Sequence, residues 1–232
     1  MPSRHFCAII LLAVDLGDDA LFSVIFDMDG TLLDTQSIYV PAWDYAGKAQ
    51  GIDNLGRHTA VVCGMNDAGW TAYLNENFPS LDIDAFVKDV KKYVNDNLII
   101  RYMPGAERLL KFLKQKGVKL ALASGSGRQQ VIDNLKQVGA TDFFDVLVGG
   151  DEVENGKPAP DIFLLAAKRL GANTKDCYVL EDSPNGVKSA VAAGIKCIGI
   201  PDVAQFNDEI KSGLTAQFKT LNEAVDFFEG LF

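Results

Sequence analysis

The chain has 232 residues, 48% of them hydrophobic, so it is long enough for one large core or for a core with an inserted domain. Its formal net charge is −9 and it has no basic stripe, which argues against a nucleic-acid partner. The apolar run over residues 6–14 is too short to span a bilayer, which argues against a membrane partner. We expect residues 1–20 to form an N-terminal extension outside the core fold.

From Phe22 onward, short apolar runs alternate with amphipathic helical patterns. Strands are predicted over Phe22–Phe26, Val118–Ala123, Val146–Val148, Cys177–Leu180 and Lys196–Ile200. Helices are predicted over Ala106–Lys116, Arg128–Val138, Asp161–Leu170 and Asn185–Ala193. This alternation predicts an α/β fold, with a parallel sheet covered by helices on both faces.

A long interval between the first two predicted strands has no strand-like run. Helical spacing of apolar residues appears instead over Ser37–Gln50, Asp67–Asn77 and Asp82–Tyr102. We therefore expect an all-helical insertion over residues 36–103 and a core made of residues 21–35 and 104–232. An insertion directly after the first strand would lie over the end of that strand, a position that suits a lid.

The four cysteines share no spacing typical of a metal site. Cys177 and Cys197 lie in apolar strand-like runs, where buried, reduced thiols are the expected state. This cysteine usage is consistent with a cytoplasmic protein.

Polar residues follow each of four predicted strands. Asp27 and Asp29 follow the first strand, and Gly30 lets the backbone turn so that both carboxylates can face one pocket. Later strands are followed by Ser124–Arg128, then by Gly156–Asp161 with its lysine, and then by Glu181–Gly186. Because parallel strands end at one edge of the sheet, these segments are expected to meet there.

Each of these segments also has a purely structural interpretation. Asp27 and Asp29 can belong to an ordinary turn before Gly30, and Ser124 or Ser183 can cap a helix. A lysine such as Lys157 is usually solvated. The occurrence of all four segments in chain order favours a phosphate and metal site over four unrelated turns.

The segments DMDGT, the Ser124 loop, GKPAPD and LEDSPNG resemble the four motifs of the haloacid dehalogenase superfamily of phosphotransferases. The resemblance covers residues 22–232, and the helical insertion resembles the small cap of the β-phosphoglucomutase-like subgroup. It implies a Rossmann-like core and a Mg²⁺ cofactor.

The resemblance also implies roles for individual residues. Asp27 would be the nucleophile that forms an aspartyl-phosphate, and Asp29 the general acid and base. Lys157 and Ser124 would hold the transferring oxygens, together with the backbone near Gly125. The further residues carried over are Ser126 as a substrate contact and, as Mg²⁺ ligands, Asp27, the Asp29 carbonyl, Asp182 and Glu181.

The expected activity is hydrolysis of small phosphorylated metabolites, with sugar phosphates as the main substrate class. The cap stretch around Asn66 and Asp67 carries no cation for a second phosphate, which disfavours the alternative of a β-phosphoglucomutase-type mutase, although Arg57 could compensate. Asn66 and Asp67 are candidate substrate contacts, and Trp70 is a candidate for either substrate contact or cap packing. A non-catalytic protein that binds a phosphorylated ligand is the second alternative. The expected assembly is a monomer or a weak dimer.

Overall fold

The computed structural model describes residues 22–62, 65, 67–203 and 205–232. The expected N-terminal extension, residues 1–20, therefore lies outside the described residues. The core strands are β1 (Ser23–Phe26), β2 (Lys119–Ala123), β3 (Val146–Val148), β4 (Cys177–Glu181), β5 (Lys196–Gly199) and β6 (Ala216–Gln217). The core helices are α5 (Ala106–Gln115), α6 (Arg128–Gln137), α7 (Asp161–Leu170), α8 (Pro184–Ala192), α9 (Asp208–Ser212) and α10 (Leu221–Glu229).

The described strands form one six-stranded parallel sheet in the order β3-β2-β1-β4-β5-β6. The predicted α/β Rossmann-like fold is confirmed. The order places β1 in the middle, with β2 and β4 hydrogen-bonded on either side of it. Residues that follow these three strands are therefore close neighbours at the carboxyl edge of the sheet.

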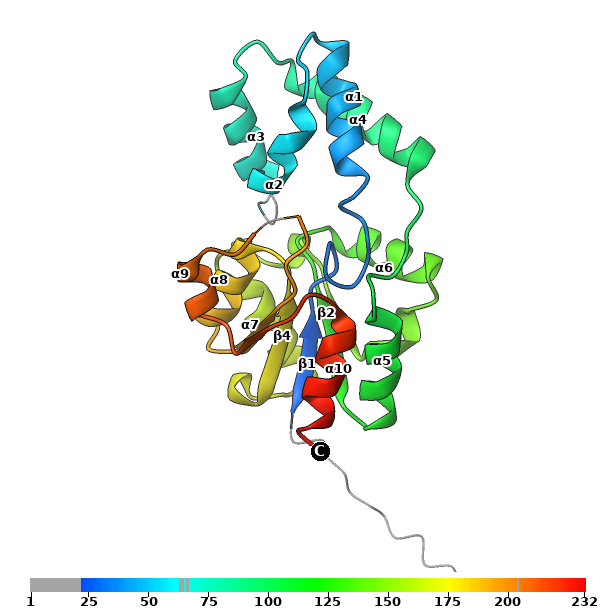
Figure 1. Ribbon diagram of the computed structural model, residues 1–232, viewed down its shortest axis with the longest axis vertical. Coiled ribbons are helices and arrows are strands. Elements are labelled where there is room, and N and C mark those ends of the chain that lie inside the picture. Colours follow the sequence, from blue (N-terminus) through cyan, green and yellow to red (C-terminus); the bar gives the residue numbers. More distant parts are fainter. Residues whose placement is uncertain (1–21, 63–64, 66, 204) are drawn as a thin grey trace, which may run out of the picture.

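Successive side chains of each strand point to opposite faces of the sheet, because an extended chain has a period of two residues. Val24 and Phe26 of β1 pack on one face with apolar residues of α5, α6 and α10. Ile25 packs on the other face with residues of α7, α8 and α9. Figure 1 shows these helices on both sides of the strands. The central strands β1 and β4 are buried along their whole length, which explains their near-continuous apolar sequences.

Four α-helices lie together beyond the carboxyl ends of the strands (Figure 1). They are α1 (Tyr39–Ala49), α2 (Thr59–Val62), α3 (Asp67–Asn77) and α4 (Ile83–Asn97), with the short 3-10 helix η1 (Leu55–His58) between α1 and α2. We call α1–α4 and η1 the helical group. It has an apolar core of its own, in which the Trp43 ring meets the Phe86 ring edge-on at 5.2 Å.

Two linkers join the helical group to the sheet, and their backbones pair with each other. Leu33 and Tyr102 form an antiparallel bridge, and the amide of Asp34 donates to the Arg101 carbonyl at 2.9 Å. This pairing explains why the helix predicted to reach Tyr102 ends at Asn97: Leu98 already has an extended backbone. None of the described helices is long and apolar enough to cross a membrane.

Candidate active site

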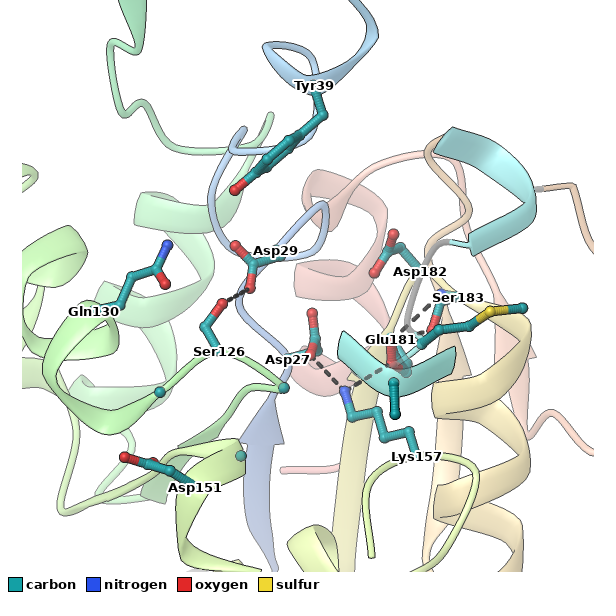
Figure 2. A pocket seen from close by; sticks show the side chains of 15 residues that line it. Asp27, Asp29, Tyr39, Ser126, Gln130, Asp151, Lys157, Glu181, Asp182 and Ser183 are labelled. Atoms are coloured by element: carbon teal, nitrogen blue, oxygen red, sulfur yellow. Dashed lines mark hydrogen bonds and ion pairs between the residues drawn. The ribbon is translucent and has the colours of Figure 1, made fainter. Parts of the chain in front are cut away.

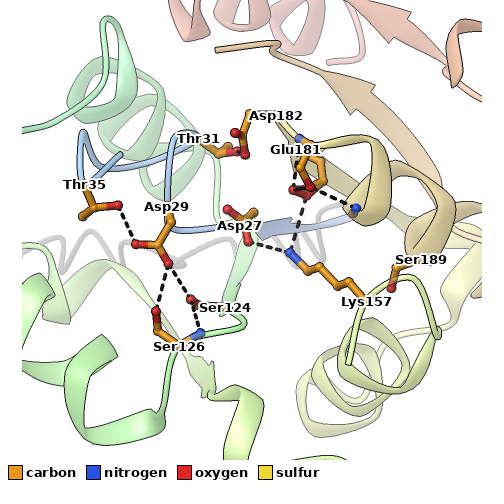
Figure 3. A network of polar contacts seen from close by, with 12 residues as sticks. Asp27, Asp29, Thr31, Thr35, Ser124, Ser126, Lys157, Glu181, Asp182 and Ser189 are labelled. Carbon is orange, nitrogen blue, oxygen red and sulfur yellow. Dashed lines mark hydrogen bonds and ion pairs between the residues drawn. The ribbon is translucent and has the colours of Figure 1, made fainter. Parts of the chain in front are cut away.

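The site is built around a buried ion pair at the end of β1. Asp27 follows the last residue of β1, and its amide donates to the Leu180 carbonyl of β4 at 3.0 Å. Lys157 comes from the loop between β3 and α7, and its Nζ donates to Asp27 Oδ1 at 2.5 Å (Figure 3). The two side chains are only 5% and 7% exposed. Removing Lys157 would leave Asp27 as an uncompensated buried charge, so the pair fixes the lysine-bearing loop at the end of β1.

Two more carboxylates lie beside this pair. Glu181 is the last residue of β4 and Asp182 follows it, and both residues are 1% exposed. Oxygen atoms of Asp27, Glu181 and Asp182 all lie within 4.8 Å of one another. Lys157 also lies 3.4 Å from Glu181 Oε2, but a single lysine cannot balance three carboxylates. Hard oxygen ligands with an excess of negative charge suit a divalent cation such as Mg²⁺.

The electrostatics of the cluster reflect this imbalance. Burial raises the pKa of Asp27 to about 8, with Lys157 opposing the shift and Glu181 and Asp29 adding to it. Burial and the charges of Glu181 and Asp27 also raise the pKa of Asp182. Burial alone would lower the pKa of Lys157, but Asp27 and Glu181 outweigh burial and raise it. A cation among these oxygens would keep the carboxylates ionised.

Asp29 is held differently, by three hydroxyl groups. Thr35 Oγ1 donates to Asp29 Oδ1 at 2.5 Å, while Ser124 Oγ and Ser126 Oγ donate to Oδ2 at 2.9 Å and 3.1 Å. Figure 3 shows the carboxylate enclosed between these donors, away from Lys157. The two aspartates of the Asp-x-Asp pair therefore have different partners: an ammonium group for Asp27 and neutral hydroxyls for Asp29.

A single amide group links the Asp29 backbone to Asp182. Gln36 Nε2 donates to the Asp29 carbonyl at 2.6 Å and to Asp182 Oδ2 at 3.1 Å, and Thr31 Oγ1 donates to Asp182 Oδ1 at 3.0 Å. Two of the oxygens predicted as cation ligands, the Asp29 carbonyl and Asp182 Oδ2, thus face the same amide nitrogen. Gly30 turns the chain here with φ +84°, and a Cβ at this residue would collide with Asp182 and Gln36.

A cavity of about 620 Å³ opens in front of these groups, between the sheet edge and the helical group (Figure 2). Gly125, Ser126 and Gly127 line one wall with backbone and hydroxyl groups, which suit an anion. Tyr39 hangs over Asp29 from the helical group. The lining residues are Asp27, Asp29, Tyr39, Met65, Ala68, Gly125, Ser126, Gly127, Gln130, Gly150, Asp151, Lys157, Glu181, Asp182 and Ser183. The cavity has the size of a small-molecule site.

The structure brings together the predicted residues Asp27, Asp29, Ser124, Lys157, Gly125, Ser126, Glu181 and Asp182. Ser124 is fully buried and directs its hydroxyl at Asp29, whereas Ser126 reaches both Asp29 and the cavity. Asn66 and the side chain of Asp67 lie outside the described residues.

The hydrogen-bonding roles of Thr35 and Gln36 were missed by the sequence reasoning. Both residues lie in the linker between β1 and α1. No sequence pattern there predicts that their side chains contact the site. The interpretation of Ser183 as a helix cap is confirmed, because its Oγ accepts from the Gly186 amide at 3.0 Å at the start of α8. The same hydroxyl donates to Glu181 Oε1 at 3.0 Å.

Comparison with known proteins places this site in a family. The family model described as haloacid dehalogenase-like hydrolase matches residues 24–200, which include the strand-end residues from Asp27 to Asp182. The chain belongs to the haloacid dehalogenase-like hydrolases. It is a hydrolase of phosphate monoesters within the β-phosphoglucomutase-like subgroup. Members of this family generally use a divalent metal, in agreement with the buried acidic cluster.

Two relatives are phosphatases by name. The phosphorylated carbohydrates phosphatase of Thermotoga maritima is 34% identical over 185 residues, which is 76% of this chain and 83% of that protein. The fructose-1-phosphate phosphatase of Escherichia coli (strain K12) is 31% identical over 183 residues, or 76% of this chain and 95% of that protein.

Solved structures of the family agree with the fold. A crystal structure from Thermotoga maritima assigned as a β-phosphoglucomutase has a TM-score of 0.71 and 29% identity, covering 91% of this chain and 100% of that chain. The structure of CbbY from Rhodobacter sphaeroides in complex with phosphate has a TM-score of 0.69 and 26% identity, covering 87% of this chain and 95% of that chain.

The close approach of Gly186 to Glu181 yields a stability prediction. A Cβ at Gly186 would overlap the Glu181 carboxylate, which is held in place by Lys157 and Ser183. Gly186→Ala should therefore lower the free energy of unfolding by about 1–3 kcal/mol, measured by urea denaturation. Gly230→Ala is the matched control, because a Cβ there meets only ordinary contacts at 3.5 Å and beyond. Equal stability of the two variants would contradict the geometry around Glu181.

The charge imbalance predicts how the protein responds to Mg²⁺. Mg²⁺ should stabilise the wild type by about 2.7 kcal/mol at a concentration about 100 times Kd, measured as a shift in thermal unfolding. Asp182→Asn should lose most of this shift, yet be at least as stable without metal, because one buried like charge is removed. Glu76→Gln, an exposed change on α3, should keep the full shift. A full Mg²⁺ shift in Asp182→Asn would show that the cation binds elsewhere.

Proposed function

We propose that this chain is a Mg²⁺-dependent phosphatase of small phosphorylated metabolites, chiefly sugar phosphates, which acts through an aspartyl-phosphate on Asp27. The observation that carries the proposal is the buried Asp27–Lys157 pair beside a separately held Asp29. Such a pair of carboxylates in different environments suits a nucleophile next to an acid/base. The phosphatases of phosphorylated carbohydrates and of fructose 1-phosphate among its relatives support sugar phosphates as substrates.

In the first step, Asp27 attacks phosphorus while the bond from phosphorus to the leaving oxygen breaks. Asp29 gives a proton to that oxygen, so that a neutral alcohol departs. In the second step, Asp29 takes a proton from a water molecule as the water attacks the aspartyl-phosphate and frees inorganic phosphate and Asp27. Ser126 and Thr35 keep the Asp29 carboxylate in one orientation during both transfers.

Charge compensation comes from Lys157 and from the metal. Lys157 and the backbone near Gly125 hold the non-bridging oxygens of the transferring group. Asp27, the Asp29 carbonyl and Asp182 would hold Mg²⁺, which supplies the positive charge that lets an anionic nucleophile approach an anionic phosphate. Glu181 is engaged by Lys157 and Ser183, so in this proposal it chiefly positions the lysine.

The helical group acts in this proposal as the cap that the sequence predicts over residues 36–103. It faces the strand ends across the cavity, and the paired linkers at Leu33 and Tyr102 give it a narrow attachment to the core. Closing of such a cap excludes water during the phosphoryl transfer to Asp27. Opening of the cap then admits the water that hydrolyses the aspartyl-phosphate. The cytoplasmic location and the monomeric or weakly dimeric state expected from the sequence stay predictions.

The charges around the cavity favour a phosphatase over a phosphomutase. A mutase must bind the second phosphate of its bisphosphate intermediate, but Lys157 is the one cation among the described residues that line the cavity. Arg57, the candidate for compensation, donates its Nε to His58 and is not among those lining residues. The undescribed residues of the neighbouring sequence, Cys63, Gly64 and Asn66, include no lysine or arginine.

Replacing the nucleophile tests the reaction class. Asp27→Asn should reduce Mg²⁺-dependent phosphate release from a panel of phosphorylated sugars, polyols and nucleotides by about 10³-fold or more, because no aspartyl-phosphate can form. Thermal unfolding of the variant serves as the control for folding. Equal rates in the two proteins would rule out Asp27 as the nucleophile.

The same panel separates the alternatives. A mutase would need a bisphosphate primer and would return little free phosphate, whereas a binding protein would release none with or without a primer. Phosphate release by the wild type without a primer is the result expected of a phosphatase.

The acid role of Asp29 can be tested with two leaving groups. Asp29→Asn should slow cleavage of an alkyl phosphate by about 10²–10⁴-fold, because its alkoxide needs a proton to leave. With p-nitrophenyl phosphate, whose phenolate leaves unprotonated, the variant should give a burst of p-nitrophenol equal to the enzyme concentration and then turn over slowly. Thr220→Val, a change remote from the site, is the control and should show the wild-type course with both substrates. Equal slowing of both substrates in the first turnover would contradict an acid role.

A further inference from the structure

A second cavity lies between the helical group and the core, next to the first. Its volume is about 430 Å³. Its lining residues are Gln36, Tyr39, Trp43, Thr59, Val62, Trp70, Phe86, Val87, Val90, Lys91, Gln130 and Val203. Tyr39 and Gln130 line both cavities, so the two spaces adjoin at these residues. Figure 2 shows the Tyr39 ring above Asp29, with Gln130 directed toward the same space from α6.

The two cavities differ in chemistry. Acidic, hydroxyl and glycine residues dominate the first, whereas aromatic and branched apolar residues of α1–α4 form most of the wall of the second. Three aromatic rings of that wall adjoin one another: the Trp43 ring lies 5.2 Å from the Phe86 ring and 6.4 Å from the Trp70 ring. Large, rigid aromatic side chains with a few polar neighbours are typical of sites for planar rings.

A few polar side chains stand at the rim of this apolar wall. Gln130 brings an amide with both donor and acceptor atoms, Thr59 a hydroxyl and Lys91 an ammonium group. Lys91 forms no ion pair with another described residue. The Thr59 hydroxyl already donates to the Gly56 carbonyl at 2.8 Å, so Gln130 and Lys91 are the side chains that can donate to a ligand. An aliphatic chain would give these two donors no acceptor, whereas a heteroaromatic ring can stack on indole and accept hydrogen bonds at its edge.

We propose that the second cavity receives a heteroaromatic ring carried by the sugar of the substrate. The preferred substrates are then nucleoside monophosphates or similar compounds. Their phosphate would lie at Asp27, the sugar between Tyr39 and Gln130, and the ring against Trp43 and Trp70. This inference rests on the proposed phosphatase function and narrows its substrate class.

Substrates that share the sugar and the phosphate but differ in the ring give the direct test. Uridine 5′-monophosphate and adenosine 5′-monophosphate should have kcat/KM values about 10-fold to 100-fold above that of ribose 5-phosphate, because only they fill the second cavity. Equal or higher kcat/KM for ribose 5-phosphate would overturn the inference and leave the phosphatase function intact.

A cavity-filling variant checks that the preference arises in this cavity. Val87→Phe should reduce the ratio of the kcat/KM values for nucleotide and ribose 5-phosphate to about 2-fold or less, because the new ring occupies the space. General damage to the fold cancels in this ratio, since both substrates share the catalytic groups. Val61→Phe is the matched control, because Val61 is 50% exposed on α2 and does not line the cavity. An unchanged ratio in Val87→Phe would overturn the inference.

A binding measurement separates this inference from the phosphatase function. The chain contains two tryptophans, and both of them line the second cavity. In Asp27→Asn, excitation at the red edge of indole absorption should give a saturable change in emission with uridine 5′-monophosphate and little change with ribose 5-phosphate. This readout needs no turnover, so it holds even if no phosphate is released. The same response to both compounds would contradict ring binding beside Trp43 and Trp70.

Discussion

The main constraint on this structure is electrostatic. Three carboxylates lie around one lysine, buried away from water, and this arrangement costs free energy. Asp27, Glu181 and Asp182 repel one another, and Lys157 alone cannot balance them. The surrounding fold supplies what the charges lack: hydroxyl and amide donors from Thr31, Ser183 and Gln36, and close approaches that only Gly30 and Gly186 allow. The remaining negative charge gives the site its affinity for a divalent cation and, through it, for a phosphate ester.

The parallel sheet is the device that makes this gathering possible. Because β1 lies between β2 and β4, the carboxyl ends of these three neighbouring strands bring Asp27, Ser124 and Glu181 close together at one edge of the sheet. The buried strands provide a rigid, apolar base, and side chains on such elements are positioned more precisely than those on loops. Lys157 comes from outside this trio, on the loop before α7, and the salt bridge ties that loop to the centre of the sheet.

The core and most of the site could be predicted from the sequence, because strong local signals specify them. The buried strands are continuous apolar runs, and the polar groups directly follow them, so strand order alone brings Asp27 and Asp182 together. Features that depend on tertiary contacts escaped prediction. The two-residue strand β6 and the one-turn helix α2 are too short for any periodicity, and the contacts of Thr35 and Gln36 depend on how the linker folds back.

The reaction follows from local sequence segments, whereas its selectivity follows from tertiary contacts. Phosphoryl transfer needs a few groups at fixed positions, and four short segments of sequence encode them. Recognition of the leaving group uses residues of four helices that share no motif: Tyr39 and Trp43 of α1, Trp70 of α3, Val87 of α4 and Gln130 of α6. The sequence places each of these residues on a helix face and says no more. An apolar side chain that packs in the cap and one that lines a cavity follow the same helical periodicity. The cap can therefore change its cavity without disturbing the strand ends. In this chain the strand ends therefore carry the reaction, and the helices above them carry the choice of substrate.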